Sequence, residues 1–464
     1  MRQLSWLTSS VVTSGGILTL QNVLVRINQM DAWFSYLLSI FYVFLIAAFF
    51  GYLVKLFPGH HIFEITKLLL GKWAGTAVNL LILFHFWQIK IRDISSISRF
   101  NTTLLLRVTP LEILILLTCV LLMYFGKSSV EVIARVNDLF YPLFVCTVMI
   151  MPLLLSNEIQ LRLLTPAMTM PIQHWFASSI LTIGSAGDIF ILGAFLHLLS
   201  NAKHVRSAIR HGSLLGFFLL TLILFLIIAV LGPMMPANFS YPTYNLVQMI
   251  HVTDFLDRVD LIMLMIWFPT ITCKHIAIYL AFLIGISSLV NDRNYPVINK
   301  PIALLITLSA ILSFKSTTEL LAFSNFASPV IVLAYQPLLM LVLVIAGLLK
   351  QRKAAANNAS DATSAPTDNG GLGITGSQGT SGTANNQHKT GQLSSRLSFT
   401  QWLWSGNVLL ILCVVCVLTG LMFGMSLPWM GKLCAMCFCV CLLLSTATTY
   451  MELTKLKQVK SGNE

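Results

Sequence analysis

The chain is organised as a series of long apolar stretches separated by short polar segments. Most of these stretches span about 20 residues, which is the length that a helix needs to cross the ~30 Å hydrocarbon core of a bilayer. A bilayer offers no water to the backbone, so spanning segments of this kind are expected to be helices. The predicted helices span residues 4–26, 31–57, 73–98, 110–126, 138–156, 173–200, 212–232, 259–288, 297–314, 325–349, 400–424 and 429–450.

A polar segment divides the predicted helices into two unequal groups. Residues 351–399 are rich in Ser, Gly, Thr, Asn and Ala and carry few large apolar side chains. Such a segment cannot bury enough apolar surface to offset the entropy lost on ordering it, so we expect a flexible low-complexity linker. The chain is thus predicted to be an all-α polytopic membrane protein. A ten-helix domain at 1–350 would be followed by the linker and by an extra transmembrane hairpin with a basic tail at 400–464.

The composition excludes most other classes of protein. Hydrophobic residues make up 56% of the 464 residues and charged residues only 10%, whereas a soluble domain carries about 25% charged residues. A soluble enzyme, a disordered protein and a secreted disulfide-rich domain are therefore excluded. The sequence contains no Walker-type loop, no G-x-S-x-G and no H-E-x-x-H motif, so we predict neither an enzyme nor a cofactor site.

The formal net charge of +12 is explained by membrane topology before any acidic partner is considered. Lys and Arg concentrate in the cytoplasmic loops of membrane proteins. If the N-terminus lies in the cytoplasm, 19 of the 29 Lys and Arg fall in cytoplasmic segments, nine fall on the outer side and Lys274 lies within a helix. The asymmetry predicts a multi-pass protein with both termini in the cytoplasm. Its partner is then expected to be the lipid bilayer and not nucleic acid.

Cysteine is concentrated in the last predicted hairpin. Six of the nine cysteines lie there, some of them in C-x-x-C spacing that occurs in metal sites. Cysteine is also a small apolar residue that suits packed membrane helices. Because no His or carboxylate is interleaved with these cysteines, we predict packing and no metal site.

Glycine-rich interruptions occur near the middle of two predicted helices. The first helix contains Thr13–Leu18 (TSGGIL), and the sixth contains Ile183–Asp188 (IGSAGD). Broken helices at matching positions of two halves are typical of transporters built from inverted repeats. We therefore predict a 5+5 inverted-repeat (LeuT-like) bundle with repeats at about 1–156 and 173–349. The alternative is that these glycines only allow neighbouring helices to pack closely.

Two charged residues lie near the centres of predicted membrane helices. Asp188 is in the sixth helix and Lys274 is in the eighth. Each would cost roughly 2.5–3.5 kcal/mol if it were left unpaired in the membrane. We expect both to face the interior of the bundle and to pair, either as a structural ion pair or as part of a ligand site.

Further charges lie in the third predicted helix. Lys90 and Asp93 are three residues apart, so they are expected to pair along the helix. Arg92 and Arg99 lie nearer to its outer end. Snorkelling to the membrane interface and ligand binding explain these two arginines equally well.

The interrupted helices predict a ligand pocket at mid-membrane. Unwound backbone there must face a cavity, since it cannot face lipid, and the N-terminus of the half-helix after a break suits a carboxylate. The third and eighth helices would supply the walls, although their His side chains also occur in proteins as satisfied core groups. The predicted lining residues are Ser14, Gly15, Gly16, Ile17, His85, Ile89, Gly184, Ser185, Ala186, Gly187, Asp188, Thr272 and His275.

Several short stretches match a family pattern. They are Ser240–Thr243 (SYPT), Asp254–Phe255 with Arg258 and Asp260, Asp31–Trp33 (DAW), Leu70–Trp73 (LGKW), Val130–Arg135 (VEVIAR) and Gly16–Leu18 (GIL). In these stretches the chain resembles the spore germination permeases, the B-type subunits of germinant receptors in endospore-forming bacteria. The resemblance covers about residues 1–350, and the family belongs to the amino acid–polyamine–organocation transporter superfamily. The family usually has Gly-Glu in the sixth helix, whereas this chain has Gly187-Asp188 and lacks the usual prolines around the breaks.

The resemblance implies a receptor subunit in the spore inner membrane, which is a bacterial cytoplasmic membrane. Such a subunit senses a small-molecule germinant, typically an amino acid and sometimes a sugar or nucleoside. It works with an A-type membrane subunit and a C-type lipoprotein. Binding would shift the broken helices between two states and start germination.

Two other functions stay open at this point. One is an amino acid secondary transporter coupled to H⁺ or Na⁺, and the other is a gated channel, because one fold supports several functions. The fifth predicted helix has no Lys and few hydroxyl groups, which disfavours a site for a coupling cation. The family typically ends after ten helices, so the resemblance implies no role for 351–464. A docking hairpin for a partner subunit and an appendage without function are the alternatives.

Overall fold

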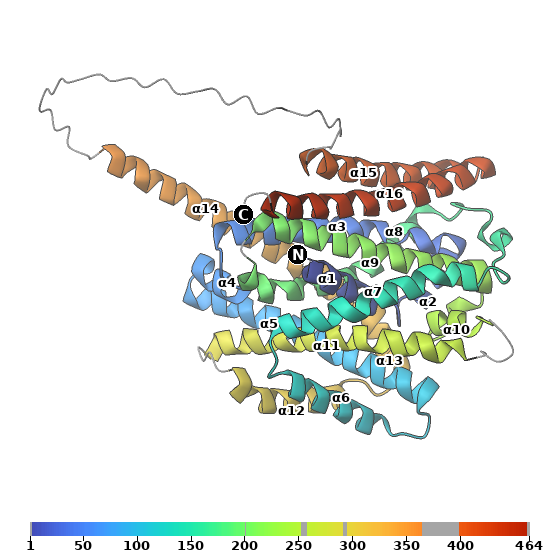
Figure 1. Ribbon diagram of the computed structural model, residues 1–464, viewed down its shortest axis with the longest axis horizontal. Coiled ribbons are helices and arrows are strands. Elements are labelled where there is room, and N and C mark those ends of the chain that lie inside the picture. Colours follow the sequence, from blue (N-terminus) through green and yellow to red (C-terminus); the bar gives the residue numbers. More distant parts are fainter. Residues whose placement is uncertain (1, 200, 252–257, 291–294, 364–398, 462–464) are drawn as a thin grey trace, which may run out of the picture.

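The computed structural model describes residues 2–199, 201–251, 258–290, 295–363 and 399–461. These residues form helices joined by short connections, and no strand occurs among them. Most of the helices run roughly parallel or antiparallel to one another in one bundle (Figure 1). The all-α class predicted from the apolar pattern is confirmed.

The first half of the bundle begins with a helix in two pieces and places two short helices among longer ones. The short helices are α4 and α6, and each lies between two longer helices. The elements are α1 (Arg2–Gly16), α2 (Gln21–Asn28), η1 (Gln29–Phe34), α3 (Leu37–Leu56), α4 (Ile62–Leu70), α5 (Lys72–Phe100), η2 (Asn101–Leu105), α6 (Leu111–Phe125) and α7 (Val130–Leu154).

The second half repeats this order of long and short elements. Its first helix changes from α to 3-10 geometry in the middle, and the short α10 and α12 occupy the positions that α4 and α6 have in the first half. The elements are η3 (Leu161–Leu164), α8 (Ile172–Gly187), η4 (Asp188–Leu198), α9 (Ala202–Leu231), η5 (Pro236–Asn238), α10 (Pro242–Gln248), α11 (Val259–Val290), α12 (Tyr295–Ser313), α13 (Thr317–Ala322), η6 (Phe323–Ala327), α14 (Ser328–Thr363), α15 (Phe399–Phe423) and α16 (Pro428–Ser461).

Each of the twelve predicted helices has a counterpart among these elements. Nine helices of the described part are long and apolar enough to cross a membrane, or ten if the bent pair formed by α1 and α2 is one span, and α6 is a shorter apolar helix. This count fits a multi-pass membrane protein. Several boundaries differ from the prediction. The helices α7 and α9 begin earlier than expected, at Val130 and Ala202, and α16 ends later, at Ser461. The helix α14 continues to Thr363, beyond the predicted start of the linker.

Glycine sets the sharp turns at two helix ends. Gly71 separates α4 from α5 with a φ of 84°, and Gly232 ends α9 with a φ of 73°. Both values lie in the left-handed region, which a side chain disfavours and glycine adopts without strain. The turn at Gly232 brings the chain toward α10, which contributes to the candidate site described below.

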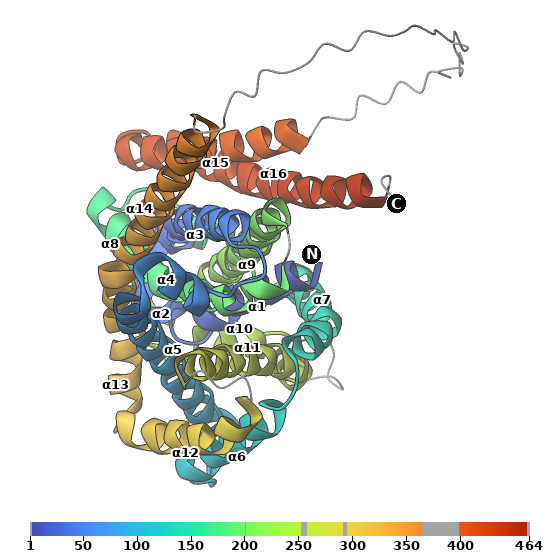
Figure 2. The same ribbon diagram turned by 90° about the vertical axis from the view of Figure 1, so that its left-hand side faces the viewer.

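The predicted C-terminal hairpin is formed by α15 and α16. It lies across the face of the bundle that contains α8 and α9, on the side opposite α6 and α12 (Figures 1 and 2). Phe438 of α16 packs edge-on against Phe34, with ring centres 5.0 Å apart. Residues outside the predicted ten-helix domain therefore share its apolar core.

Polar contacts also hold the hairpin to α9. Arg210 of α9 pairs with Glu452 of α16 at 3.5 Å, and both side chains are only 2% exposed. The same guanidinium donates a hydrogen bond to Asn407 of α15 at 2.8 Å. His211 lies 3.1 Å from the hydroxyl of Thr449. Since buried polar groups must find partners, these contacts fix the position of the hairpin on α9.

We expect Glu452→Gln to destabilise the protein by about 3–5 kcal/mol, because it leaves the buried Arg210 without its counter-charge. The loss should be measured as a lower midpoint of thermal unfolding in detergent. Glu131→Gln is the matched control, since the pair of Glu131 with Arg135 is about two-thirds exposed and exposed pairs contribute about 0–1 kcal/mol. Equal losses of stability in the two variants would contradict the claim that polar contacts hold the hairpin to the bundle.

The structure changes the assignment of several basic residues. Lys90, Arg92 and Arg99 are buried between helices, with exposed fractions of 0, 5 and 9%. They therefore no longer count among the Lys and Arg of the outer side. Without them, the excess of Lys and Arg in the predicted cytoplasmic segments over the outer segments is larger. The cytoplasmic location of the termini stays a prediction.

Candidate functional site

The first helix is broken near the centre of the bundle. The segment of α1 and the segment formed by α2 and η1 meet at 63°, and residues 17–20 between them form a turn. The predicted interruption at Thr13–Leu18 is therefore real, but the unwound residues begin later, after Gly16. The turn exposes backbone carbonyl groups that no longer bond within a helix.

Side chains from two other elements bond the free carbonyls of this break. The hydroxyl of Thr243 in α10 donates to the carbonyl of Ile17 at 3.0 Å. The amide of Asn325 donates to the carbonyl of Thr19 at 2.9 Å. Asn325 lies in η6, a short π-helix, and such segments are frequent at functional sites. The position of the break is thus fixed by both α10 and η6.

The sixth predicted helix is not unwound, which corrects the expectation for this segment. It passes from α8 into the 3-10 helix η4 at Asp188 and stays helical throughout. A Cβ added to Gly184 would lie 2.8 Å from Pro329, and one added to Gly187 would lie 2.6 Å from Val332. These two glycines therefore allow α8 and α14 to pack closely, which is the alternative that the sequence left open.

Four buried charges meet beside the break. Lys274 of α11 lies 2.9 Å from Asp188 and 2.8 Å from Asp93 of α5. The guanidinium of Arg92 lies 2.6 Å from Asp188 and 2.8 Å from Asp93, and it donates to the hydroxyl of Ser328 in α14 at 3.0 Å. The two positive and two negative side chains balance, and they join α5, η4, α11 and α14. We call these four residues the charge cluster.

The charge cluster confirms one predicted pair and corrects another. Asp188 and Lys274 are in contact and face the bundle interior, as expected. Lys90, however, donates to the backbone carbonyl of His275 at 2.8 Å, while Asp93 is bonded by Arg92 and Lys274. One partner of Asp93 is its neighbour in the chain and the other comes from α11 across the bundle, so the i, i+3 spacing on α5 does not determine its pairing.

A small polar cavity of about 20 Å³ lies between the break and the charge cluster. Its wall combines a guanidinium and a carboxylate with four hydroxyl groups and one imidazole. The volume is room for about one water molecule. We call it the polar cavity. The lining residues are Ser14, Gly15, Leu18, Thr19, Arg92, Asp93, Ser96, Ile271, His275 and Ser324.

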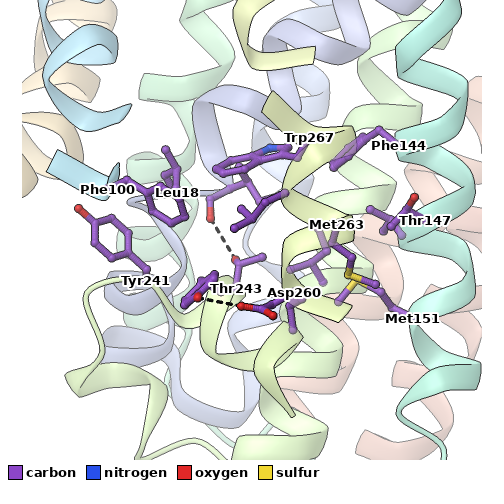
Figure 3. Close-up of a pocket in the computed structure, with 16 residues that line it drawn as sticks. Leu18, Phe100, Phe144, Thr147, Met151, Tyr241, Thr243, Asp260, Met263 and Trp267 are labelled. Atoms are coloured by element: carbon purple, nitrogen blue, oxygen red, sulfur yellow. Dashed lines mark hydrogen bonds between the residues drawn. The ribbon is translucent and has the colours of Figure 1, made fainter. Parts of the chain in front are cut away.

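A second cavity of about 60 Å³ lies on the other side of the break. Figure 3 shows its labelled aromatic side chains, Phe100, Phe144, Tyr241 and Trp267, around the same space as Leu18. Its walls are almost wholly apolar. We call it the aromatic cavity. The lining residues are Ile17, Leu18, Phe100, Phe144, Thr147, Val148, Met151, Ile223, Tyr241, Thr243, Tyr244, Val247, Asp260, Met263, Leu264 and Trp267.

The structure brings some of the predicted pocket residues together. Ser14, Gly15 and His275 line the polar cavity. Asp188 stands directly behind it, since a Cβ added to Gly15 would lie 3.1 Å from the Asp188 carboxylate and 3.4 Å from Ser185. This part of the predicted pocket therefore forms one continuous region.

The other predicted residues lie elsewhere. Gly16 faces Leu220 of α9, and Ile17 lines the aromatic cavity. His85 and Ile89 line a separate small space next to α14. The remaining four contribute to packing or bond within their own helix: Gly184 and Gly187 contact α14, Ala186 is fully buried, and the Thr272 hydroxyl donates to the carbonyl of Phe268.

Sequence reasoning missed the central position of Arg92. The arginine is adjacent to Asp93 in the chain, and an Arg-Asp pair well inside an apolar helix is the signal that favours a buried network over snorkelling. Ser96, one turn further along α5, also lines the polar cavity. The contribution of Ser324 from η6 has no signal in the local sequence. One stretch of the family pattern, Asp254–Phe255, lies outside the described residues.

No metal centre accompanies this site in the part of the chain that the structure describes. Groups of three or more His, Cys, Asp or Glu that could hold a metal ion are absent from it. The cysteines of the hairpin are unpaired, and Cys413 and Cys434 are buried. They pack within the hairpin and between it and the bundle.

Comparison with known proteins gives a consistent result. A family model described as "Spore germination protein" matches residues 1–318. The Bacillus subtilis protein YfkT, which carries a provisional assignment as a spore germination protein, is 27% identical over 325 residues, covering 70% of this chain and 88% of the relative. Spore germination protein A2 of the same organism is 26% identical, covering 56% of this chain and 72% of the relative. Spore germination protein KB is 21% identical, covering 72% and 90%.

The family match includes the elements that build the site. Residues 1–318 contain the break in the first helix, the charge cluster and most of both cavities, whereas η6, α14 and the C-terminal hairpin lie beyond it. On this match, the chain belongs to the family of spore germination proteins.

Proposed function

We propose that this chain is the membrane subunit of a spore germinant receptor and that it binds a small germinant, an amino acid, in the polar cavity. The family supports the role in germination. The observation that carries the site is that Arg92 and Asp93 both line a cavity next to a broken helix. A concave, buried pocket with a few convergent polar groups is typical of a ligand-binding site.

The chemistry of the polar cavity suits a zwitterion. The carboxylate of Asp93 is an acceptor for a ligand ammonium group, and the guanidinium of Arg92 is a donor to a ligand carboxylate. The hydroxyl groups of Ser14, Ser96 and Ser324 add further donors and acceptors at the wall. The N-terminus of α2, two residues after Thr19, adds a positive end of a helix dipole. A sugar or nucleoside does not carry both an ammonium group and a carboxylate, so it would gain less from Asp93 and Arg92.

Binding requires this region to change shape. The polar cavity has about 20 Å³, which holds about one water molecule, so it is too small for an amino acid in this conformation. An amino acid enters only if the break or the surrounding helices move. A ligand that binds the widened state better shifts the population toward it. In the proposal, that shift is the signal that the subunit passes on.

The order of elements supports the proposed 5+5 inverted repeat. A first helix in two pieces, a long helix, a short helix, a long helix, a shorter helix and a final helix occur in the first half and again in the second. The two first helices differ, since α1 and α2 are separated by a turn whereas α8 continues into η4 without unwinding. Repeats of this kind place the substrate site at their broken helices, where the polar cavity lies.

The proposed setting is a multi-subunit receptor in the spore inner membrane. Its partners would be an A-type membrane subunit and a C-type lipoprotein, with both termini of this chain in the cytoplasm. The names A2 and KB among the relatives suit subunits of related assemblies. The proposal includes no catalytic step and no cofactor.

The second candidate is an amino acid transporter coupled to H⁺ or Na⁺, and one observation favours it. Carboxylates in the membrane interior often relay protons in transporters, and the charge cluster contains two, Asp93 and Asp188. Against it, α7 contains no lysine, and two of the polar groups that it turns toward α1 already have partners, since Tyr141 is bonded to Ser9 at 2.6 Å and Asp138 is paired with Arg2. A gated channel is a third candidate that no particular contact favours.

Thermal unfolding of the purified protein should be compared across amino acids, sugars and nucleosides. We expect some amino acids to raise the unfolding midpoint, because a ligand that binds only the folded state stabilises it. Sugars or nucleosides that raise it while every amino acid fails would contradict the proposed ligand class. Protein in liposomes separates the receptor from the transporter: uptake of an amino acid against its gradient, driven by an ion gradient, would contradict the receptor proposal.

A further inference from the structure

Leu18 lies between the two cavities at the break. Its side chain lines the polar cavity and the aromatic cavity. It belongs to the turn at residues 17–20 and to neither α1 nor α2. A change of its rotamer therefore connects the two spaces without unwinding a helix.

The two cavities are also one helical turn apart on both neighbouring helices. On α5, Ser96 lines the polar cavity and Phe100 lines the aromatic cavity. On α11, Ile271 and Trp267 do the same. Residues four apart on a helix are about 6 Å apart along its axis, so a single small molecule spans both spaces.

The aromatic cavity offers mainly apolar surface, and several of the polar groups around it are already bonded. The Thr243 hydroxyl donates to the Ile17 carbonyl, and the Tyr244 hydroxyl donates to the Asp260 carboxylate at 3.0 Å (Figure 3). Asp260 also accepts a hydrogen bond from Arg258 at 3.1 Å. The indole N–H of Trp267 is the exception, since it is buried without a partner. Away from it, a polar ligand group would lose its water without gaining a partner, whereas an apolar group gains from burial.

The size of the aromatic cavity limits the apolar group that it takes. Its volume is about 60 Å³, while a cavity that binds benzene in an engineered protein has about 150 Å³. A short aliphatic chain fits this space, and an aromatic ring does not.

We propose that the aromatic cavity binds the aliphatic side chain of the same ligand whose charged groups bind in the polar cavity, with Leu18 as the movable partition. The ligand class is then an amino acid with an aliphatic side chain of about three carbons. This inference rests on the proposed function, because it assumes that an amino acid binds in the polar cavity.

A homologous series of ligands tests the inference on the unaltered protein. Glycine, L-alanine, L-2-aminobutyrate and L-norvaline differ by one carbon each, and their dissociation constants should be measured by calorimetry with the purified full chain. Each added carbon should tighten binding about fourfold, which corresponds to ~0.8 kcal/mol for a buried methylene. L-phenylalanine should bind more weakly than L-norvaline. Equal or falling affinity along the series would overturn the inference.

A pair of variants on α11 tests whether the gain in affinity along this series arises in the aromatic cavity. Met263→Trp fills the aromatic cavity, because Met263 lines it. We expect the gain from L-alanine to L-norvaline to disappear in this variant. Met265→Trp is the control, since Met265 is 77% exposed on the outer surface of the same helix. A gain that persists in Met263→Trp would overturn the inference.

The outcomes separate this inference from the proposed function. If glycine binds as tightly as L-norvaline, the polar cavity still binds amino acids and only the role of the aromatic cavity is wrong. If no amino acid of the series binds, the proposed function fails, and the inference fails with it.

Discussion

Lys274→Met is expected to destabilise the protein by about 3–5 kcal/mol, because it removes one positive charge from a buried network. Asp188 and Asp93 would then share only Arg92, and the cluster would carry an unbalanced negative charge away from water. The additional change Asp188→Asn restores the balance, leaving the pair of Arg92 and Asp93. The double variant should therefore be more stable than Lys274→Met alone. Thermal unfolding in detergent and the amount of folded protein in membranes measure both effects.

A matched control separates this effect from the loss of any lysine. Lys315→Met removes an exposed lysine, and surface charges contribute about 0–1 kcal/mol, so its unfolding midpoint should equal that of the unaltered protein. A double variant no more stable than Lys274→Met would contradict the account of the charge cluster as a balanced unit.

If the chain binds an amino acid as proposed, Ser14→Leu is expected to abolish the response of spores to that amino acid. Leucine adds three carbon atoms to a wall of a cavity with about 20 Å³, so it leaves no space for a ligand. The change introduces no charge and removes none from the charge cluster. Germination should be followed as the loss of spore refractility in a strain that depends on this receptor.

Ser14→Ala is the control at the same position. It removes the hydroxyl group but fills nothing, so we expect the response to weaken by no more than about tenfold, the value of one hydrogen bond of 0.5–1.5 kcal/mol. Both variants should be present in the spore membrane at the level of the unaltered protein. A full response in Ser14→Leu at normal abundance would place the ligand site elsewhere.

Much of the fold follows from the sequence because the apolar pattern reports which segments leave water. That pattern predicts a helix at every place where the structure has a membrane-length element. It predicts boundaries less well, since the early start of α7 at Val130 and the extension of α14 to Thr363 lie in polar sequence that helices also tolerate. The buried pair of Arg210 and Glu452 joins segments far apart in the chain, so only tertiary packing reveals it.

The candidate site was predictable only in part, for a physical reason that two glycine motifs illustrate. Gly15 and Gly187 stand in similar sequence, yet the first lines the polar cavity and the second contacts Val332. Whether a glycine admits a ligand or a neighbouring helix depends on the position of that helix, which local sequence does not specify. Asp93 shows the same limit, because its partners Arg92 and Lys274 replace the neighbour expected at helical spacing.

The central claim is that an amino acid binds in the polar cavity, and calorimetric titration of the purified chain and its Ser14 variants tests it most directly. The titrant is the amino acid that most raises the unfolding midpoint. The account predicts saturable binding at one site in the unaltered protein and in Ser14→Ala, and no measurable binding in Ser14→Leu. Binding of equal affinity in a folded Ser14→Leu variant would contradict it.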